Sequence, residues 1–378
     1  MDKLDLPRLK EISLEWSDIE SQYRIAPYNA PINQQEEKEK TIEAYQNNRT
    51  YNPQFEYDSP PNFPTARIKE FISKLQEDRS YFENLYYKQA RNDLLCIESI
   101  QNHDPEYITA HSCLAFGLPD RELLDRAKKG ISLHLSNEEN PSEQEFTSFE
   151  VAKQMDRVLK AINLLDWKAI TVEAMNSRVA INRLDKEIKI KKDKAFSLSE
   201  LNRLILHEVG VHIFRYENGC KQPIKLFEEG FPGYISTEEG LAMSTEEKFN
   251  LLDRETFKKY CGRVVATHLS LYNSFFDVFQ QIVPDFGCDA AFDMVTRVKR
   301  GLRDTSALGV YSKDIAYLQG YYKLQKYFQE NPDRYDVLFL GKFGLEDLDY
   351  IQSLYKENLL EAPQFLPNQL TSLTISQK

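Results

Sequence analysis

The sequence has few cysteines, no CxxC pair and no long apolar run. Its five cysteines are scattered over 378 residues, which predicts free thiols in a reducing compartment rather than a disulfide framework. No apolar stretch approaches the roughly 18 residues needed to cross a bilayer. The charged, amphipathic N-terminus lacks the apolar core of a secretory signal. These absences argue against a disulfide scaffold and a membrane protein, and we expect a cytoplasmic protein.

Positive charge is also scarce, since the formal net charge is −11. Nucleic acids and anionic membranes both select positive surfaces, so we expect neither as a partner. Two basic stretches, residues 183–194 and 297–303, run against this balance. The simpler interpretation is that they form solvated faces, and the alternative is that they attract an acidic ligand locally.

The length and composition predict a soluble globular protein. Hydrophobic residues make up 41% and charged residues 28% of the chain, which is ordinary for such proteins. We expect three consecutive parts: an N-terminal helical and extended segment over residues 1–64, a main domain over 65–361 onto which that segment packs, and a flexible tail over 362–378. No internal repeat is evident.

The apolar spacing predicts a mainly helical protein of the α+β class. Helical periodicity covers residues 66–99, 120–130 and 143–166, whereas alternation around a charged connection at 178–192 predicts a small β-hairpin. The Pro/Asn-rich stretch 47–64 cannot form a regular helix, and we expect it to be a surface connector.

The clearest helix follows the hairpin, so the small sheet should lie beside it. Ser197 and Glu200 match a capping box at its start, and Asn218-Gly219 supplies a stop. The chain has only six histidines, and two of them flank a glutamate in the segment HEVGVH at 207–212. This pattern is typical of zinc peptidases, in which the histidines bind the metal.

The spacing of these histidines is unusual. His207 and His212 are five residues apart, so an undistorted helix would place their rings roughly 140° apart, too far to share one ion. A one-residue π-bulge would bring the rings to one face, and Gly210 is well suited to absorb it. The alternative is a regular helix with a core histidine at 207, a surface histidine at 212 and an incidental Glu208.

A catalytic zinc site needs three protein ligands and an open position for water. None of the other histidines lies close in sequence. Glu238 and Glu239 follow a turn and begin the next helix, where acidic residues also interact favourably with the helix dipole. The residues alone leave these two carboxylates open as the third ligand. Two histidines and a glutamate favour zinc over other divalent metals.

Two motifs together resemble a known family. HEVGVH, followed by TEEGLA at 237–242, looks like the HExxxH and (Q/E)EGLA pair of the microtubule-associated tyrosine carboxypeptidases and their bacterial relatives, the QEGLA-motif proteins. Weaker motifs agree with this resemblance along roughly residues 20–355: NPQFEY at 52–57, RGLRD at 300–304 and KDIAYLQG at 313–320.

The resemblance implies a zincin-like peptidase over residues 65–361 with one zinc ion per chain. It implies that His207 and His212 are zinc ligands and that Glu239 is the third. It also implies that Glu208 is the catalytic base, which agrees with the need for a carboxylate beside zinc-bound water. The implied reaction removes a C-terminal tyrosine or phenylalanine from a peptide or protein tail.

Such an enzyme also needs a cation for the terminal carboxylate. Arginine suits this task because its planar fork pairs with a carboxylate in a bidentate manner. Arg300 and Arg303 are the candidates, with Lys313 behind them and Tyr317 as a donor to the oxyanion. Each of these is equally well explained as an ordinary surface or helix-pairing residue.

The acidic balance of the chain disfavours acidic tubulin tails as the substrate, although it does not affect the peptidase chemistry. A different class also fits the motifs, namely a regulatory or binding protein that keeps the fold and the zinc without turnover. The retained Glu208 favours the enzyme, because a structural zinc does not require a base beside its ligands.

Overall fold

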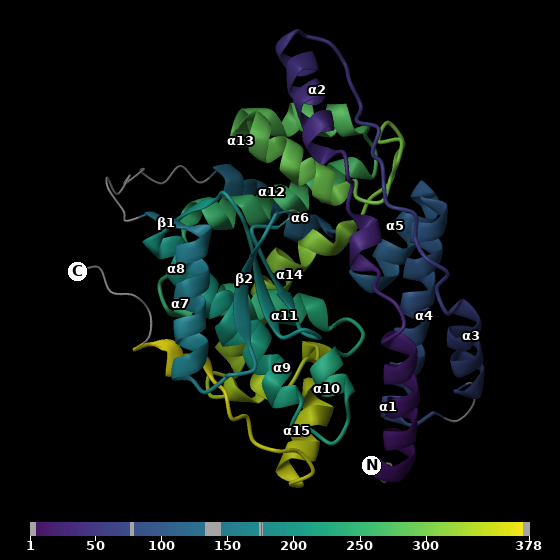
Figure 1. Cartoon of the computed structure of the whole chain (residues 1–378), viewed down its shortest axis with the longest axis vertical. Coiled ribbons are helices and arrows are strands. Elements are labelled where there is room, and N and C mark those ends of the chain that lie inside the picture. Colours follow the sequence, from purple (N-terminus) through teal and green to yellow (C-terminus); the bar gives the residue numbers. More distant parts are fainter. Residues whose placement is uncertain (1–4, 76–78, 133–144, 174, 176, 373–378) are drawn as a thin grey trace. The chain divides into compact units, whose positions relative to one another are not determined.

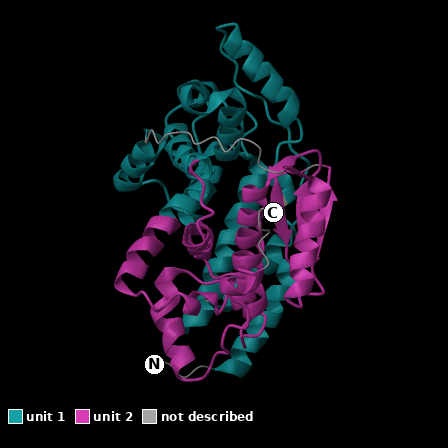
Figure 2. Cartoon of the chain, turned by 90° about the vertical axis from the view of Figure 1, so that its left-hand side faces the viewer, with its two compact units in different colours: residues 1–133, 255–319 teal, residues 134–254, 320–378 magenta. Residues whose placement is uncertain are grey.

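The computed structural model describes residues 5–75, 79–132, 145–173, 175 and 177–372. The chain forms two compact units (Figure 2): unit 1 comprises residues 1–133 and 255–319, and unit 2 comprises residues 134–254 and 320–378. Each unit is built from two separate stretches of sequence. This division therefore differs from the three consecutive parts expected above, which followed composition along the chain.

The regular elements in the described part of unit 1 are all helices. Its elements are α1 (Leu6–Glu20), η1 (Ala26–Asn29), α2 (Gln34–Gln46), α3 (Thr65–Lys74), α4 (Tyr81–Asn102), α5 (Pro105–Ala115), α6 (Arg121–Ser132), most of α12 (Arg254–Ser270), α13 (Phe275–Val298), η3 (Ser312–Asp314) and the first turn of α14 (Ile315–Glu330).

Helices α1, α3 and α4 lie side by side in unit 1 (Figure 1). Each presents an apolar stripe to the others, and the rings of Trp16 and Phe71 pack at a centroid distance of 5.2 Å. The residues 66–99 that were expected to be helical form α3 and α4, with a break between them. The expected helix over 120–130 is α6.

The segment 47–64 has no helix, as predicted, and most of its residues are exposed or partly exposed, but several of its side chains are buried. Phe55 and Tyr57 are buried, with 2% and 7% of their surface exposed, in the core around α13. The ring of Phe55 packs edge-on against Phe275 at 5.9 Å, and the Tyr57 hydroxyl donates to the Leu302 carbonyl at 3.1 Å. Two aromatic residues in a polar, proline-rich stretch are enough to anchor it in the core.

Unit 2 contains both helices and strands. Its elements are β1 (Glu145–Thr147), α7 (Ser148–Ala161), β2 (Lys168–Val172), β3 (Val179–Asn182), β4 (Glu187–Lys191), β5 (Ala195–Ser197), α8 (Leu198–Leu204), the π-helix η2 (Ile205–Ile213), α9 (Phe214–Gly219), α10 (Leu226–Glu229), α11 (Tyr234–Lys248), the remainder of α14, η4 (Asp336–Phe339), η5 (Leu345–Asp347), α15 (Leu348–Lys356) and η6 (Pro367–Leu370).

The predicted hairpin is confirmed and belongs to a larger sheet. β3 and β4 pair antiparallel, and β2 adds to the other edge of β4 in parallel, in the order β2-β4-β3. The side chains of Ile188 and Ile190 are fully buried, as strand alternation requires. Helix α7 packs on β2 and β4, and β3 contacts η2. The expected small sheet beside the motif helix is therefore present, and the α+β class is confirmed.

Helix α7 begins later than the expected residue 143 for a local reason. Thr147 is its N-cap and forms a capping box with Glu150, so the helix cannot extend further toward the N-terminus. The preceding residues 145–147 pair with β5 as the short strand β1.

The expectation of a flexible tail over 362–378 is wrong for the described residues 362–372. The Asn218 side chain accepts hydrogen bonds from the amides of Gln364 and Phe365 at 2.8 and 3.0 Å and donates to the Phe365 carbonyl at 2.9 Å. The Phe365 ring packs on Phe214 at 5.4 Å, and Leu370 is fully buried. Although this segment is polar in composition, the buried side chains of Phe365 and Leu370 fix its position.

None of the helices in the described part of the chain combines the length and apolar character required to span a bilayer.

The packing of this C-terminal segment can be tested with Leu370→Ala. Removing a fully buried leucine side chain should cost about 2–5 kcal/mol of unfolding free energy, because it leaves a cavity against the motif helix. Leu359→Ala is the matched control, since 37% of Leu359 is exposed. Thermal and denaturant unfolding of both variants measures the difference, and equal losses of stability would contradict the packed tail.

Candidate metal centre

The histidine motif lies on one helical run that changes its winding midway. α8 begins after Ser197, whose side chain accepts a hydrogen bond from the Glu200 amide at 3.1 Å, so the predicted N-cap is confirmed. η2 then continues as a π-helix over nine residues, and α9 returns to α-helical winding. The predicted π distortion is present and is longer than the single-residue bulge that was expected.

This winding brings the two histidine rings together. A π-helix closes hydrogen bonds between residues five apart, so those residues stack on one face. The ring centroids of His207 and His212 are 4.8 Å apart. Gly210 lies within the π segment, and a Cβ added there would stand only 3.1 Å from the Leu370 side chain. Gly210 therefore also permits the close approach of the C-terminal segment.

Helix α11 places Glu239 opposite the two rings. Its Oε2 lies 3.5 Å from His207 Nε2 and 3.6 Å from His212 Nε2. All three potential ligand atoms lie within 4.8 Å of one another. Tetrahedral zinc ligands at about 2.0–2.1 Å from the ion are themselves about 3.3 Å apart, and the two distances from Glu239 Oε2 to the histidine nitrogens are close to this value.

Glu238, the other carboxylate that the sequence left open, faces away from this triplet. Its Oε1 accepts a hydrogen bond from His212 Nδ1 at 2.9 Å. Glu246, two turns further along α11, accepts one from His207 Nδ1 at 2.6 Å. An ionised carboxylate can only accept, so each imidazole donates from Nδ1 and directs toward Glu239 its Nε2, the atom that can bind a metal once it carries no proton. Carboxylates behind metal-binding histidines commonly have this role.

Buried cations hold these outer carboxylates. Arg203 Nη1 lies 3.1 Å from Glu246. Arg215 Nη1 and Lys342 Nζ lie 2.5 and 3.2 Å from Glu238. Arg215 is fully buried, and its remaining donors bond to the carbonyls at positions 338 and 343 at 2.9 and 2.8 Å. Because each partner is itself fixed, the imidazoles have little freedom to turn.

The electrostatics of the cluster favour positive charge at its centre. Burial disfavours a protonated His207, but hydrogen bonds to Glu239 and Glu246 outweigh it and raise the pKa of His207 to about 10. Burial likewise opposes a charged Glu238, yet Lys342 and Arg215 hold the pKa of its carboxyl well below the ordinary range. The cluster thus stabilises a cation beside His207, and either a proton or a metal ion can supply that charge.

Glu208 belongs to the same buried region, with 8% of its surface exposed. Its charge contributes to the raised pKa of His207. It precedes His212 by four residues within the π-helix. Its role as a base remains a prediction.

Two glycines set the position of helix α11. A Cβ added at Gly240 would overlap the backbone of Gly320 in α14, and a Cβ added at Gly320 would overlap the Ser236 carbonyl. The two helix backbones therefore touch directly at the residue that follows Glu239. Only glycine permits such an approach.

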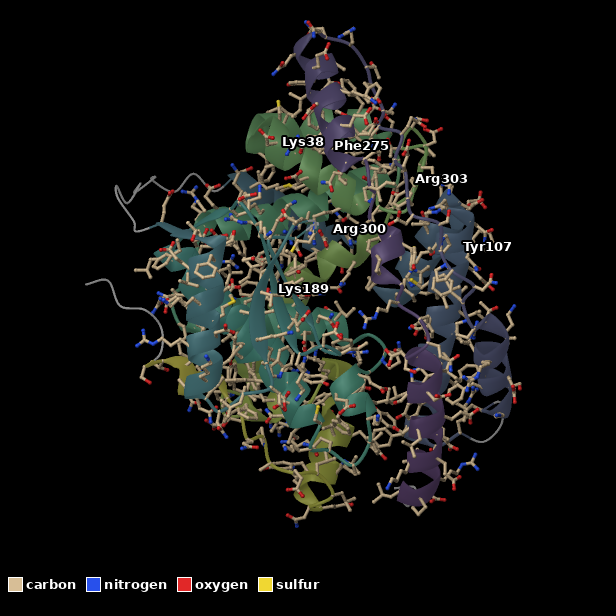
Figure 3. All side chains as sticks on the ribbon, viewed as in Figure 1. Lys38, Tyr107, Lys189, Phe275, Arg300 and Arg303 are labelled. Atoms are coloured by element: carbon tan, nitrogen blue, oxygen red, sulfur yellow. The ribbon has the colours of Figure 1, made fainter. Side chains whose placement is uncertain are left out.

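The other predicted site residues belong to unit 1, whereas the histidine–glutamate cluster belongs to unit 2. Arg300 and Arg303 follow α13 (Figure 3), Lys313 lies in η3, and Tyr317 lies in the first turn of α14. Arg303 is exposed, whereas Arg300 is partly buried over the Tyr311 ring at 5.6 Å. Their roles in substrate binding and oxyanion donation remain predictions.

Sequence reasoning missed four residues of the cluster: Glu246, Arg203, Arg215 and Lys342. Two of them had a signal in helical spacing. Arg203 lies four residues before His207, and Glu246 lies seven after Glu239, so each shares a helix face with a candidate ligand. Lys342 comes from a distant segment and had no such signal.

The fold and the cluster together define an α+β protein with a candidate three-ligand metal centre on a π-helical HExxxH segment. The model of the family described as microtubule-associated tyrosine carboxypeptidase matches residues 43–378. The chain belongs to this family.

Three mammalian relatives are similar over most of the chain. MATCAP2 of Mus musculus is 26% identical over 361 residues, which cover 89% of this chain and 57% of the relative. Microtubule-associated tyrosine carboxypeptidase 1 is 26% identical in Mus musculus, over 89% of this chain and 64% of the relative, and 26% identical in Homo sapiens, over 85% and 60%. The chain thus spans roughly three fifths of the length of these relatives.

Gly240→Ala tests the close packing of α11. In an ordinary helix interior, alanine stabilises by about 1 kcal/mol relative to glycine. Here the added methyl group would force two backbones apart, and overpacking of this kind costs about 1–3 kcal/mol. We therefore expect denaturant unfolding to show a loss of stability. A gain of the ordinary size would contradict the contact between the helices.

Proposed function

We propose that this chain is a zinc-dependent carboxypeptidase with a zincin-like fold, which removes a C-terminal tyrosine or phenylalanine from a peptide or protein tail. The observation that carries the proposal is the convergence of His207 Nε2, His212 Nε2 and Glu239 Oε2 on one point. The family of the chain and the names of its relatives support the reaction class.

The charges around this point suit a divalent cation. Among the described residues, four buried carboxylates lie in this region, at positions 208, 238, 239 and 246, and of these four only Glu238 and Glu246 form ion pairs with Arg203, Arg215 and Lys342. Burying an excess of negative charge is costly unless a cation compensates it. Two imidazoles and one carboxylate suit zinc, and three protein ligands leave one position for water, as in catalytic sites.

Glu208 is the residue that moves protons in this mechanism. A zinc ion held by His207, His212 and Glu239 would act as a Lewis acid, lowering the pKa of water to about 7 and polarising the scissile carbonyl. The Glu208 carboxylate takes the proton from the attacking water and later delivers it to the leaving amine. Its buried position excludes bulk water, which would otherwise compete for that proton.

The proposed reaction also requires residues that recognise the substrate. A carboxypeptidase must hold the free carboxylate at the end of its substrate, and Arg300 and Arg303 supply cations for this with Lys313. Tyr317 donates to the oxyanion that develops on the scissile carbonyl. We propose no nucleic acid or membrane partner and a cytoplasmic location, in line with the acidic composition.

The metal centre can be tested by metal analysis. Purified protein should contain about one zinc per chain, and both His212→Ala and Glu239→Ala should lose it because each removes one of three ligands. Glu208→Gln should keep the zinc and lose at least 100-fold in the rate of tyrosine release from a peptide ending in tyrosine, since it removes the general base. Amidation of the same peptide is the substrate control.

Absence of zinc from the parent protein after reconstitution would contradict the metal centre. Zinc without release of any terminal residue would leave the centre intact and favour the regulatory or binding alternative.

Glu246→Gln tests the carboxylate behind His207. Loss of its charge should weaken zinc binding about 10–100-fold, because the imidazole loses the anchor that orients it. Glu247→Gln is a matched control on the same helix, because Glu247 is exposed and bonds to the Tyr321 hydroxyl instead. Chelator competition measures both affinities, and equal values would show that Glu246 does not orient the ligand.

A further inference from the structure

We propose that unit 1 carries an oxyanion site, in which Arg263 and Arg300 bind a carboxylate beside the ion pair of Arg297 and Asp314. The peptide source of that carboxylate rests on the proposed carboxypeptidase function, whereas the site itself rests only on the geometry of unit 1.

The centre of the site is a single carboxylate among several guanidinium groups. Arg297 pairs with Asp314 in a bidentate manner through Nε and through Nη2, the latter at 2.8 Å. Arg263 Nε lies 3.7 Å from the same carboxylate. Although burial opposes its charge, the surrounding arginines hold the pKa of Asp314 well below its ordinary range. The carboxylate of Asp314 cannot balance the guanidiniums of Arg263, Arg297 and Arg300, so an excess of positive charge remains.

Arg300 carries the least compensated part of this charge. Within the described part of the chain, no carboxylate lies within 4 Å of its guanidinium, and no hydrogen bond to that group is present. Its guanidinium lies 5.6 Å from the centroid of the Tyr311 ring. Burial and the like charge of Arg297 lower the pKa of Arg300. A partly buried cation without a counter-ion is costly, and an anionic ligand would remove that cost.

Neighbouring aromatic rings orient the Arg263 guanidinium, but the side chain remains partly exposed. Its guanidinium lies 5.2 and 5.1 Å from the ring centroids of Tyr260 and Tyr317, and those rings stack on each other at 4.7 Å with an angle of 14°. About 20% of the Arg263 side chain and 24% of the Arg297 side chain remain exposed. The stack therefore fixes the orientation of a guanidinium that solvent and ligands can still reach.

The chemistry of the ligand follows from the arginines. A guanidinium pairs best with a planar or tetrahedral oxyanion through two parallel hydrogen bonds. The C-terminal carboxylate of a peptide and inorganic phosphate both provide such a group, and the stacked tyrosines favour the peptide when its last residue is aromatic. Arg263 is an addition to the sequence-based candidates, since it lies outside both the motif that suggested Arg300 and the basic stretch 297–303 that contains Arg297.

The test is equilibrium binding to the full chain carrying Glu208→Gln, in order to suppress turnover. The probes are a short peptide ending in tyrosine with a free carboxylate, the same peptide amidated, and inorganic phosphate. We expect the peptide with the free carboxylate to bind at least about tenfold tighter than the amidated peptide. Arg263→Gln and Arg300→Gln should each lower the affinity for the free acid about tenfold. Arg121→Gln, whose side chain is 96% exposed, is the matched control and should change nothing.

The outcomes separate the site from the proposed reaction. Phosphate binding that depends on both arginines, without peptide binding, supports the oxyanion site and assigns it to a free anion. Arginine-dependent peptide binding together with a parent chain that releases no tyrosine also supports the site, while overturning the proposed reaction.

Unchanged affinities for all three probes in a folded Arg263→Gln variant overturn the site. Arg263→Gln is the decisive variant, because its partly exposed side chain is less important for folding than that of Arg300. Thermal unfolding verifies that each variant is folded.

Discussion

The candidate centre depends on one feature of backbone winding. His207 and His212 can face the same point only because the helix between α8 and α9 is π-helical. π-helices are rare because their hydrogen bonds and packing are less favourable than those of the α-helix, so the surroundings must stabilise this one. A capped α-helical turn precedes it, β3 lies against it, and the C-terminal segment packs on Gly210. Residues far apart in sequence thus stabilise one π-helical segment.

A second constraint is that groups of opposite charge follow one another outward from the π-helix, from imidazole to carboxylate to cation. Each imidazole contacts a carboxylate, and each carboxylate contacts at least one cation. Arg215 extends this order to the segment around positions 338–343 through its bonds to two main-chain carbonyls. Glu238 and Glu246 thereby each have a partner of opposite sign, which is the condition under which buried charges are tolerated. The geometry of the centre is coupled in this way to loops that contain none of its ligands.

Local features of the sequence predicted much of this arrangement, and non-local ones did not. Ser197 as a cap, the hairpin over 178–192 and the π distortion each follow from residues a few positions apart. Residue spacing alone left the choice between Glu238 and Glu239 open, since neighbouring residues on a helix differ in direction by about 100°. The resemblance to the family selected Glu239, which is also the carboxylate that lies opposite the two rings. The C-terminal segment was predicted wrongly because two buried apolar residues decide its position, despite its polar composition.

The π-helix also affects how insertions and deletions can alter this motif during evolution. It accommodates one residue more than an α-helix of the same length would between the two histidines, and it does so locally. Deleting a single codon within that interval would give the four-residue spacing of an α-helical motif, and both rings would stay on one face. Arg215 and Asn218 would keep their directions relative to His212, because the α-helix resumes at Phe214. Histidine spacings of four and five can therefore differ by a single inserted residue, which the change from α-helical to π-helical winding absorbs.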